Sequence, residues 1–260
     1  MNQSERRRYL IQELIKENPQ YKNIQIPQTK EEQKQLLRSL MNIRFAAPIS
    51  DEFTKIQDEY LEEENQNRGI VQLEDLTEIK KDIYLWQGDI TRLKASAIVN
   101  AANSGMTGCY QPCHNCIDNC IHTYAGIQLR NYCNTMIKKQ GHEEPTGQAK
   151  ITPAYNLPAD YVIHTVGPIV HGGFLQKRHE KLLESCYRSC LETVEENKLA
   201  SIAFCCISTG VFMFPNERAA EIAVKTVQKF KEETNSQIKV IFNVFKDEDL
   251  EIYGRLLCAK

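Results

Sequence analysis

The sequence predicts an α/β protein, a layered sandwich in which helices cover both faces of one sheet, preceded by a helical segment. From about residue 70, short apolar runs typical of strands alternate with longer stretches in which apolar residues recur at helical spacing. Such alternation favours one sheet between layers of helices. Before residue 70 only the helical spacing is present. We therefore expect an N-terminal helical extension, residues 1–69, packed on a main domain, residues 70–260.

Residues 4–64 carry the apolar spacing of helices. Leu10 and Leu14 belong to one apolar stripe, and Pro19 and Pro27 interrupt the pattern. Thr29, followed closely by two glutamates, is typical of a helix start. Because each stripe needs a surface to cover, we expect these helices to pack on the main domain rather than to form a flexible tail. The polar residues 62–66 are expected to form an exposed connection.

In the main domain, apolar runs locate the strands and amphipathic stretches locate the helices. The expected strands are residues 83–86, 97–99, 161–166, 201–207 and 239–244. The expected helices are residues 116–138, 182–197, 215–233 and 247–258. In residues 161–166, β-branched side chains occupy both faces, as they do in a strand buried on both sides of a sheet.

Composition argues against several classes of protein. The net charge of -2 gives no basic footprint for nucleic acid or for an anionic membrane surface. No apolar run approaches the roughly 20 residues that span a bilayer, and the first residues do not resemble a secretory signal. The ten cysteines are therefore expected to be reduced thiols, some of them metal ligands, in a cytoplasmic protein. The sequence leaves the oligomeric state open.

Two segments follow predicted strands, where open α/β sheets bind their ligands. Asp89, just after Gly88, offers a carboxylate to an exocyclic amine, or caps the start of a helix. Residues 100–105 place two small alanines between Asn100 and Asn103, which would let a ligand approach closely while Asn103 positions a sugar hydroxyl. A plain turn is the alternative for this second segment.

A third segment, residues 208–212, follows the strand expected at 201–207. Successive backbone N–H groups around Gly210 could form a concavity that binds phosphate. The segment lacks the lysine of a P-loop, so the pattern alone is weakly specific. Phe212 would either stack on a ligand ring or belong to the core.

A cluster of thiols and one imidazole lies between residues 109 and 120. Its members are Cys109, Cys113, His114, Cys116 and Cys120. This donor set favours zinc. Residues 114 and 116 cannot share one helical face, so both reach one ion only if the chain turns before a helix that begins near Cys116. Four protein ligands would make a closed structural site, and three would leave a position open.

Together these segments resemble the macrodomain family, and specifically its zinc-dependent ADP-ribosyl hydrolase branch found in microbes. The matching segments, in order, are residues 88–91, 97–103, 108–109, 114–119, 121–122, 125–126, 161–168 and 207–212. The match extends from about residue 83 to 258, and a helical N-terminal extension is also typical of this branch. The resemblance implies a three-layer α/β/α sandwich with a mixed central sheet.

The resemblance also implies roles for individual residues. Asp89 would contact the adenine amine, Ile90 would offer its backbone N–H, and Asn103 would orient the distal ribose. The segment that would wrap the diphosphate is Ser208, Thr209, Gly210, Val211 and Phe212, with Phe212 near the distal ribose. One Zn²⁺ would be held by Cys109, His114 and Cys116, with Ile117 and Asp118 beside the ligand. Cys113 and Cys120 lie outside the family's pattern and leave the ion's fourth position open.

The implied activity is zinc-dependent hydrolysis that removes mono-ADP-ribose from modified proteins. Our hypothesis gives zinc the role of a Lewis acid, which polarises a ribose oxygen or activates water. Asn103 would hold the sugar in line, and Asp118 would serve as a base or as a supporting group, although an aspartate also stabilises a helix start. Two alternatives are a non-catalytic ADP-ribose reader with a structural zinc and an O-acetyl-ADP-ribose deacetylase. A zinc-stabilised nucleic-acid binder is disfavoured by the charge balance.

Overall fold

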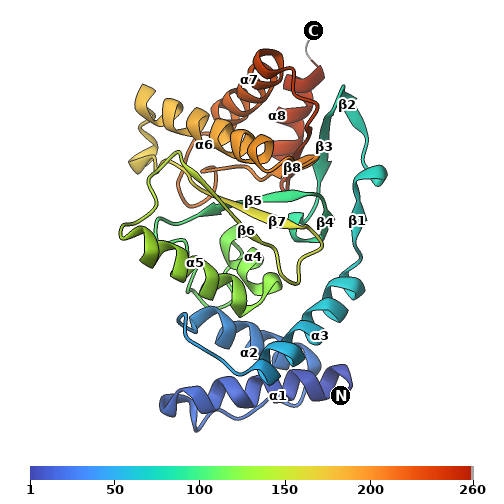
Figure 1. Cartoon of the computed structure of the whole chain (residues 1–260), viewed down its shortest axis with the longest axis vertical. Helices are drawn as coiled ribbons and strands as arrows, with labels where there is room; N and C mark the ends of the chain where they lie inside the picture. Colours follow the sequence, from blue (N-terminus) through green and yellow to red (C-terminus); the bar gives the residue numbers. More distant parts are fainter. Residues whose placement is uncertain (259–260) are drawn as a thin grey trace.

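A seven-stranded mixed sheet forms the centre of the main domain, and the computed structural model describes residues 1–258 (Figure 1). The strand order is β2-β3-β9-β8-β5-β7-β6. The five inner strands run parallel and are β3 (Ile83–Gln87), β9 (Lys239–Val244), β8 (Ser201–Phe204), β5 (Ala97–Ala102) and β7 (Tyr161–Val166). The edge strands β2 (Glu78–Lys80) and β6 (Ala149–Pro153) are antiparallel to their neighbours. All the inner strands therefore end at one edge of the sheet.

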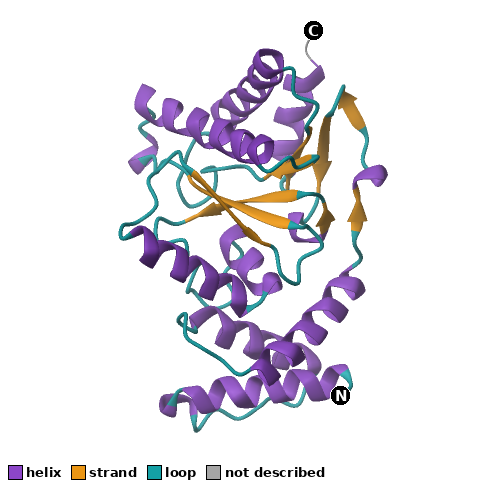
Figure 2. Ribbon diagram, in the orientation of Figure 1, coloured by secondary structure: helices purple, strands orange, loops and turns teal. Residues whose placement is uncertain are grey.

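Helices cover both faces of this sheet (Figures 1 and 2). One face carries α6 (Lys177–Glu196), α7 (Asn216–Thr234) and α8 (Asp247–Cys258), and the other carries α4 (Ile117–Ala125) and α5 (Ile127–Gln140). Ala97, Ile98 and Val99 of β5 are fully buried because the strand has helices on both sides. The predicted three-layer α/β/α sandwich with a mixed sheet is confirmed.

Short elements connect the layers. Strands β1 (Val71–Gln72) and β4 (Leu93–Lys94) pair as a separate two-stranded parallel sheet. The 3-10 helices are η1 (Pro19–Tyr21), η2 (Leu73–Asp75), η3 (Ile90–Arg92) and η4 (His171–Gly173).

The N-terminal extension consists of α1 (Gln3–Glu17), α2 (Lys30–Ile43) and α3 (Asp51–Arg68), which lie beyond α4 and α5 (Figure 1). Their apolar stripes meet in a cluster that includes Leu10, Leu37 and Phe53, all buried. Thr29 caps α2 by accepting from the N–H of Glu32, as its sequence context predicts. The helices pack on the main domain, whereas the division between residues 69 and 70 stays a prediction.

Several sequence predictions about element boundaries are wrong. The helix predicted at 182–197 begins earlier, at Lys177. Residues 62–66 are not an exposed connection, because α3 continues to Arg68 and the buried Asn65 donates to Asn156 O at 2.6 Å. The strand predicted at 201–207 ends at Phe204, the last residue that pairs with β9. The strand predicted at 97–99 continues to Ala102, which pairs with Val166 of β7, so part of the predicted turn is strand.

The helix predicted at 116–138 is two helices, and Gly126 separates them. Its φ of +97° is not helical. A Cβ at this position would lie 2.6 Å from Gln57 Nε2 of α3, and Gln57 Oε1 accepts the N–H of Ile127 at 3.0 Å. The break therefore lets α3 of the extension approach the backbone between α4 and α5.

Candidate active site at the carboxyl edge of the sheet

The carboxyl ends of the inner strands place the predicted binding segments in a row. Along the sheet, β3 leads to Asp89, β9 to Phe245, β8 to residues 208–212, and β5 to Asn103. Adjacent strands are about 4.8 Å apart, so the row from β3 to β5 spans about 14 Å. The sheet thus brings together segments that are far apart in the sequence, in an order that suits an elongated ligand.

Asp89 stands at the β3 end of the row with both carboxylate oxygens engaged. Oδ1 accepts from Thr91 N at 3.0 Å and from Thr91 Oγ1 at 2.6 Å, so Asp89 does cap a helix start, that of η3. Oδ2 accepts from Arg68 Nη2 at 2.5 Å, and the Arg68 guanidinium lies 3.5 Å from the centre of the Tyr124 ring. The side chain of Asp89 is still 35% exposed, and a carboxylate has room for a further donor.

The next residue, Ile90, has a buried side chain and an N–H group that makes no hydrogen bond within residues 1–258. Phe245, the residue after β9, is 76% exposed, and its carbonyl accepts from Gln87 Nε2 at 3.3 Å. Sequence reasoning missed Phe245, although an aromatic residue directly after a strand was the available signal. These two residues add a free donor and an exposed ring beside Asp89.

Residues 208–212 form a loop whose donors are largely free. Within residues 1–258 the N–H groups of Ser208, Gly210, Val211 and Phe212 make no hydrogen bond. The loop is closed by Phe214 N donating to Ser208 O at 3.0 Å and by Met213 N donating to Gly210 O at 3.0 Å. Several free N–H groups around a glycine suit an anion such as a diphosphate.

Individual residues of this loop differ in what they can offer. Thr209 donates from both N and Oγ1 to Cys206 O, so its donors are already used. The hydroxyl of Ser208 is buried without a partner among the described residues, and Ser208 has a φ of +66°. Phe212 is half-buried, and its carbonyl accepts from Val170 N at 2.8 Å. The loop is thus held against the segment that follows β7.

Asn100 and Asn103, at the end of β5, converge on one buried carboxylate. Asn100 Nδ2 donates to Asp118 Oδ1 at 2.8 Å, and Asn103 Nδ2 donates to Asp118 Oδ2 at 3.2 Å and to Gly108 O at 3.1 Å. Burial raises the pKa of Asp118 to about 6, while the hydrogen bond from Asn100 opposes this shift. Asn100 is fully buried and structural, whereas Asn103 is part-exposed and can reach a ligand.

The metal-binding pattern of the sequence is present as a compact group. The thiol sulfurs of Cys109 and Cys116 and a ring nitrogen of His114 all lie within 4.8 Å of one another. The Cys109 Sγ to His114 Nδ1 distance is 3.7 Å. Two thiols and one imidazole are zinc ligands by type, so these residues fit that ion. Asn103 is linked to the group by its hydrogen bond to the carbonyl of Gly108, the neighbour of Cys109.

The local backbone explains how His114 and Cys116 face the same point. Cys116 is the N-cap of α4, and its sulfur accepts from Asn119 N at 3.4 Å. Before it, Cys113 has a φ of +53°, which turns the chain sharply. The predicted turn, followed by a helix that begins beside Cys116, is therefore present. Burial raises the pKa of the Cys116 thiol to about 12, and a bound cation would favour the thiolate instead.

Cys113 and Cys120 do not belong to the group. The sulfur of Cys113 lies 3.2 Å from Ser39 Oγ and 3.5 Å from Gln35 O, and the sulfur of Cys120 lies 3.7 Å from Arg38 Nη2. Among the described residues the group therefore offers three ligands, which is the number that leaves a position open. Ile117, the first residue of α4, follows Cys116 in the chain and is half-buried.

A second set of donor atoms, His122, Cys133 and His164, is fully enclosed in the main domain. The two ring nitrogens of His164 lie 3.1 Å from Asn100 Nδ2 and 3.0 Å from Thr152 Oγ1. Burial lowers the pKa of His164 to about 3, so the ring is neutral. These contacts assign His164 to holding β5, β6 and β7 together.

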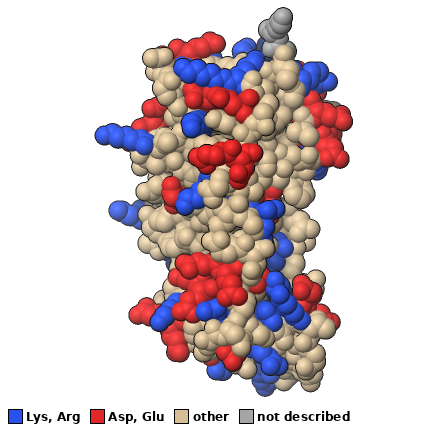
Figure 3. Space-filling model, turned by 90° about the vertical axis from the view of Figure 1, so that its right-hand side faces the viewer, with Lys and Arg blue, Asp and Glu red and all other residues tan. Residues whose placement is uncertain are grey.

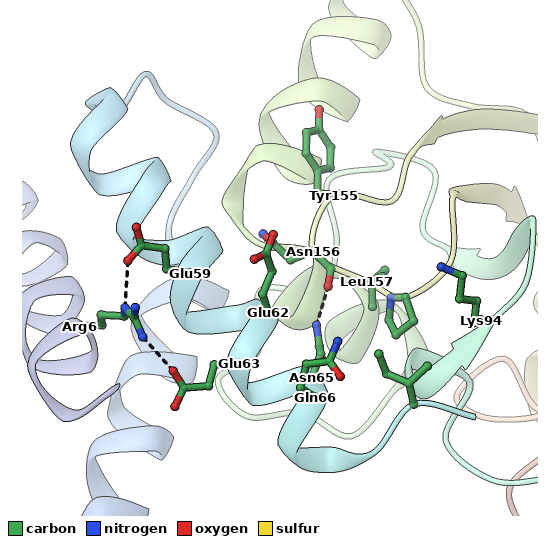
Figure 4. Close-up of a pocket in the computed structure, with 12 residues that line it drawn as sticks. Arg6, Glu59, Glu62, Glu63, Asn65, Gln66, Lys94, Tyr155, Asn156 and Leu157 are labelled. Carbon is green, nitrogen blue, oxygen red and sulfur yellow. Dashed lines mark hydrogen bonds and ion pairs between the residues drawn. The ribbon is translucent and has the colours of Figure 1, made fainter. Parts of the chain in front are cut away.

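A cavity of about 570 Å³ lies elsewhere, between α3 and the loop before β7 (Figure 4). Glu59, Glu62 and Glu63 line it from the extension, and Lys94 and Tyr155 line it from the main domain. Lys94 and Tyr155 precede β5 and β7, so the cavity is at the amino ends of the strands. It does not belong to the row of segments at their carboxyl ends.

The surface carries charges of both signs. On the face shown in Figure 3, acidic and basic side chains are interspersed over the extension and the main domain. None of the helices within residues 1–258 has the length and apolar character needed to cross a membrane.

Comparison with known proteins places these features in context. The family model described as Macro domain matches residues 99–223. A protein from Treponema medium named Protein-ADP-ribose hydrolase is 57% identical over 99% of this chain and 100% of its own length. A protein of the same name from Staphylococcus aureus strain MSSA476 is 50% identical over 94% of this chain and 92% of its own.

Solved structures show the same likeness. The Trypanosoma brucei macrodomain in complex with ADP-ribose is similar with a TM-score of 0.66 and 31% identity, over 82% of this chain and 93% of that one. The Oceanobacillus iheyensis macrodomain with ADP is similar with a TM-score of 0.62 and 36% identity, over 70% of this chain and 93% of that one.

Proposed function

The chain belongs to the macro domain family, and on that premise we propose that it is a hydrolase that removes mono-ADP-ribose from modified proteins. The observation that carries this proposal is the metal-binding group of Cys109, His114 and Cys116, joined through Gly108 to Asn103. The metal-binding group thus lies beside Asn103, at the β5 end of the row of segments that suits a nucleotide. The name of the Treponema medium and Staphylococcus aureus relatives supports the same activity.

ADP-ribose would lie along the carboxyl edge of the sheet with its adenine at the β3 end. Asp89 would accept from the adenine amine, the free N–H of Ile90 would donate, and the exposed ring of Phe245 would stack on the base. The free N–H groups of residues 208–212 would bind the diphosphate. The distal ribose then reaches Asn103 and Ile117, beside the metal-binding group. The Trypanosoma brucei structure with ADP-ribose supports this choice of ligand.

We propose one Zn²⁺ as the cofactor, held by Cys109, His114 and Cys116. When bound, zinc supplies a Lewis acid close to the distal ribose. Asn103 orients the sugar, and Asp118 fixes Asn103 by accepting from its Nδ2. Because Asp118 also accepts from Asn100, its contacts favour this supporting role over that of a base. The open fourth position favours catalysis over a reader with a closed structural zinc.

We also propose a compartment, a partner and a domain boundary for the protein. Free thiols among the described residues, ten in all, favour a reducing compartment, and we propose the cytoplasm. The partner would be a mono-ADP-ribosylated protein. We also propose that the extension ends at Gly69, just after α3, and that residues 70–260 form the macrodomain.

The test is release of ADP-ribose from a mono-ADP-ribosylated protein, with and without a zinc chelator. Wild type should contain one zinc and release ADP-ribose, and Cys116→Ser should lose the zinc and at least about 100-fold in turnover, the equivalent of roughly 3 kcal/mol. Cys113→Ser is the matched control and should retain one zinc, because its sulfur lies outside the group. Full activity of zinc-free Cys116→Ser protein would sink the zinc mechanism. Greater turnover of O-acetyl-ADP-ribose would favour deacetylation instead.

A further inference from the structure

We propose that helix α2 of the N-terminal extension positions the metal-binding loop, residues 109–116, and that Arg38 is the principal positioning residue. The inference rests on the proposed function, since it assigns a role relative to the zinc ion. Arg38 and the loop are separated by more than seventy positions in the sequence, yet the hydrogen bonds of this one side chain reach the backbone of the loop.

Arg38 and Asn119 together contact all the residues of the metal-binding group. Arg38 Nη2 donates to His114 O at 2.7 Å and to Asn119 Oδ1 at 2.9 Å. Asn119 Nδ2 lies 3.4 Å from Cys109 O, and Asn119 N donates to Cys116 Sγ at 3.4 Å. Asn119 is fully buried, so its amide orientation is fixed by these partners. Removing the Arg38 donor would leave both His114 O and Asn119 Oδ1 without this partner.

A second residue of α2 holds the turn that precedes His114. Asn42 Oδ1 accepts from Cys113 N at 2.9 Å, and Asn42 Nδ2 donates to Thr123 Oγ1 of α4 at 3.0 Å. Cys113 adopts a φ of +53°, which costs a residue with a side chain about 1 kcal/mol or more. The hydrogen bond that Asn42 accepts from Cys113 N favours this conformation over alternatives. The turn and the last turn of α4, which contains Thr123, are thus fixed to the same helix.

The end of α2 is itself anchored to the main domain. Arg130 of α5 donates from Nη1 to Met41 O at 3.0 Å and to Asn42 O at 2.7 Å, and from Nε to Thr107 O at 2.6 Å. The carbonyls of Met41 and Asn42 belong to the last turn of α2, where a helix leaves carbonyls without internal partners. Arg130 therefore connects the last turn of α2 to the chain just before Cys109.

The physical effect of these contacts is preorganisation. A loop that is already ordered loses little conformational freedom when it binds an ion. Partners that orient metal ligands from behind typically change metal affinity by about 10- to 100-fold when removed. Neither Arg38 nor Asn42 lies along the row that would bind adenine and diphosphate. Their loss should therefore weaken zinc binding while leaving ADP-ribose affinity nearly unchanged.

The experiment compares the zinc affinity of full-length Arg38→Ala, Arg38→Lys and wild type by competition with a chromogenic chelator. Arg38→Ala should bind zinc about 10- to 100-fold more weakly, and Arg38→Lys should fall between the two because an ammonium lacks the planar fork of a guanidinium. Arg6→Ala is the matched control. Arg6 pairs with Glu59 and Glu63 within the extension and should remain within about twofold of wild type.

Two further measurements distinguish a positioning role of Arg38 from a general loss of structure. Cobalt-loaded Arg38→Ala should show a changed visible spectrum, while ADP-ribose binding by calorimetry stays within about twofold. Equal weakening of zinc binding in Arg6→Ala and Arg38→Ala would overturn the proposal, as would unchanged zinc affinity in Arg38→Ala. If Arg38→Ala does not fold, Arg38→Lys decides by the same criteria. If wild type binds ADP-ribose but no zinc, both this inference and the zinc role in the proposed function are overturned. If wild type binds zinc and the Arg38 variants bind it equally well, this inference alone is overturned.

Discussion

Asp118 illustrates how a charged side chain can be accommodated in the interior beside a ligand site. Asp118 is 5% exposed, and its carboxylate accepts from Asn100 and Asn103, one amide on each oxygen. Desolvation favours the neutral acid, and the two amides favour the anion. The resulting pKa of about 6 means that the group is still ionised at neutral pH. Asn103 is thereby held in one orientation at the end of β5.

His164 leads to a prediction about acid stability. Burial lowers its pKa from 6.5 to about 3, so the unfolded chain binds a proton between these values that the folded chain does not. Stability is therefore lost as pH falls below 6.5, by about 1.4 kcal/mol per pH unit from this group. Replacing it in His164→Gln should flatten the pH dependence. The measurement is the free energy of unfolding in urea at pH 7.0 and 5.5.

The pH dependence of wild type is compared with that of His164→Gln because other groups around His164 also titrate. His122 of α4, whose pKa is also lowered by burial, acts in the same direction. Asp118 acts in the opposite direction because its pKa is raised, and the Cys133 thiol stays protonated throughout. These groups are common to both proteins. The exposed His142→Gln is the control, and an identical loss of stability in wild type and His164→Gln between the two pH values would contradict the prediction.

The residues of the site divide into those that the sequence indicates and those that it does not. Cys109, His114 and Cys116 are close in the chain, so their density and spacing predict their grouping. Arg38, in contrast, donates to a backbone carbonyl 76 positions away. Every residue has a backbone carbonyl, so the identity of the accepting residue gives no sign of such a hydrogen bond in the sequence. The same reason accounts for Arg130, whose acceptors are carbonyls of α2 and residue 107.

At the scale of elements, the sequence predicts the types of the main helices and strands but not their junctions. Apolar periodicity continues from α4 into α5, so it predicts one helix. The break at Gly126 is imposed by Gln57 of α3, a tertiary contact that periodicity does not record. Strand β6 was missed because its residues are partly exposed at the edge of the sheet and include Pro153. Pairing with β7, rather than local pattern, makes it a strand.

The junction at Gly126 gives a prediction about substitution. Gly126→Ala should destabilise the protein by about 3 kcal/mol, because φ of +97° is strained for alanine and the added Cβ would meet Gln57 Nε2. Gly141→Ala is a matched control, because Gly141 also has a positive φ, +82°, but an added Cβ meets nothing within 4 Å. The control should cost about 1 kcal/mol. Urea unfolding measures both, and equal losses would show that neither the contact with α3 nor the extended ψ of Gly126, 171°, adds to the cost of a positive φ.

On the scale of the whole molecule, residues 1–258 contain two apolar clusters with a largely polar boundary between them. One lies in the main domain, and the other lies among α1, α2 and α3 and includes only Ile127 from the main domain among its buried members. Across the boundary run hydrogen bonds of buried side chains, among them Gln57, Asn65 and Arg130. Such groups are costly to separate singly because each would leave buried partners unsatisfied. The extension and the main domain are therefore expected to unfold together.

Arg130 is the residue on which this coupling can be tested. It is 5% exposed and donates to carbonyls of Met41, Asn42, Arg44 and Thr107. Arg130→Met keeps an apolar side chain of similar length but removes every donor, and it should cost about 3 kcal/mol. Because the lost bonds join the two clusters, the extension should then melt before the main domain. Calorimetry should record one transition for wild type and two for the variant.

The control for this prediction is Arg188→Met, which removes an exposed ion pair with Glu233 between α6 and α7. Exposed pairs contribute little, so its melting should remain a single transition with a stability change within about 0.5 kcal/mol. A single transition at the wild-type temperature in Arg130→Met would mean that the remaining contacts across the boundary, among them those of Ile127, Gln57 and Asn65, couple the two clusters without Arg130. Two transitions in Arg130→Met would mean that removing this guanidinium uncouples the extension from the macrodomain. In wild type, the polar boundary would then be what makes the two parts one cooperative unit.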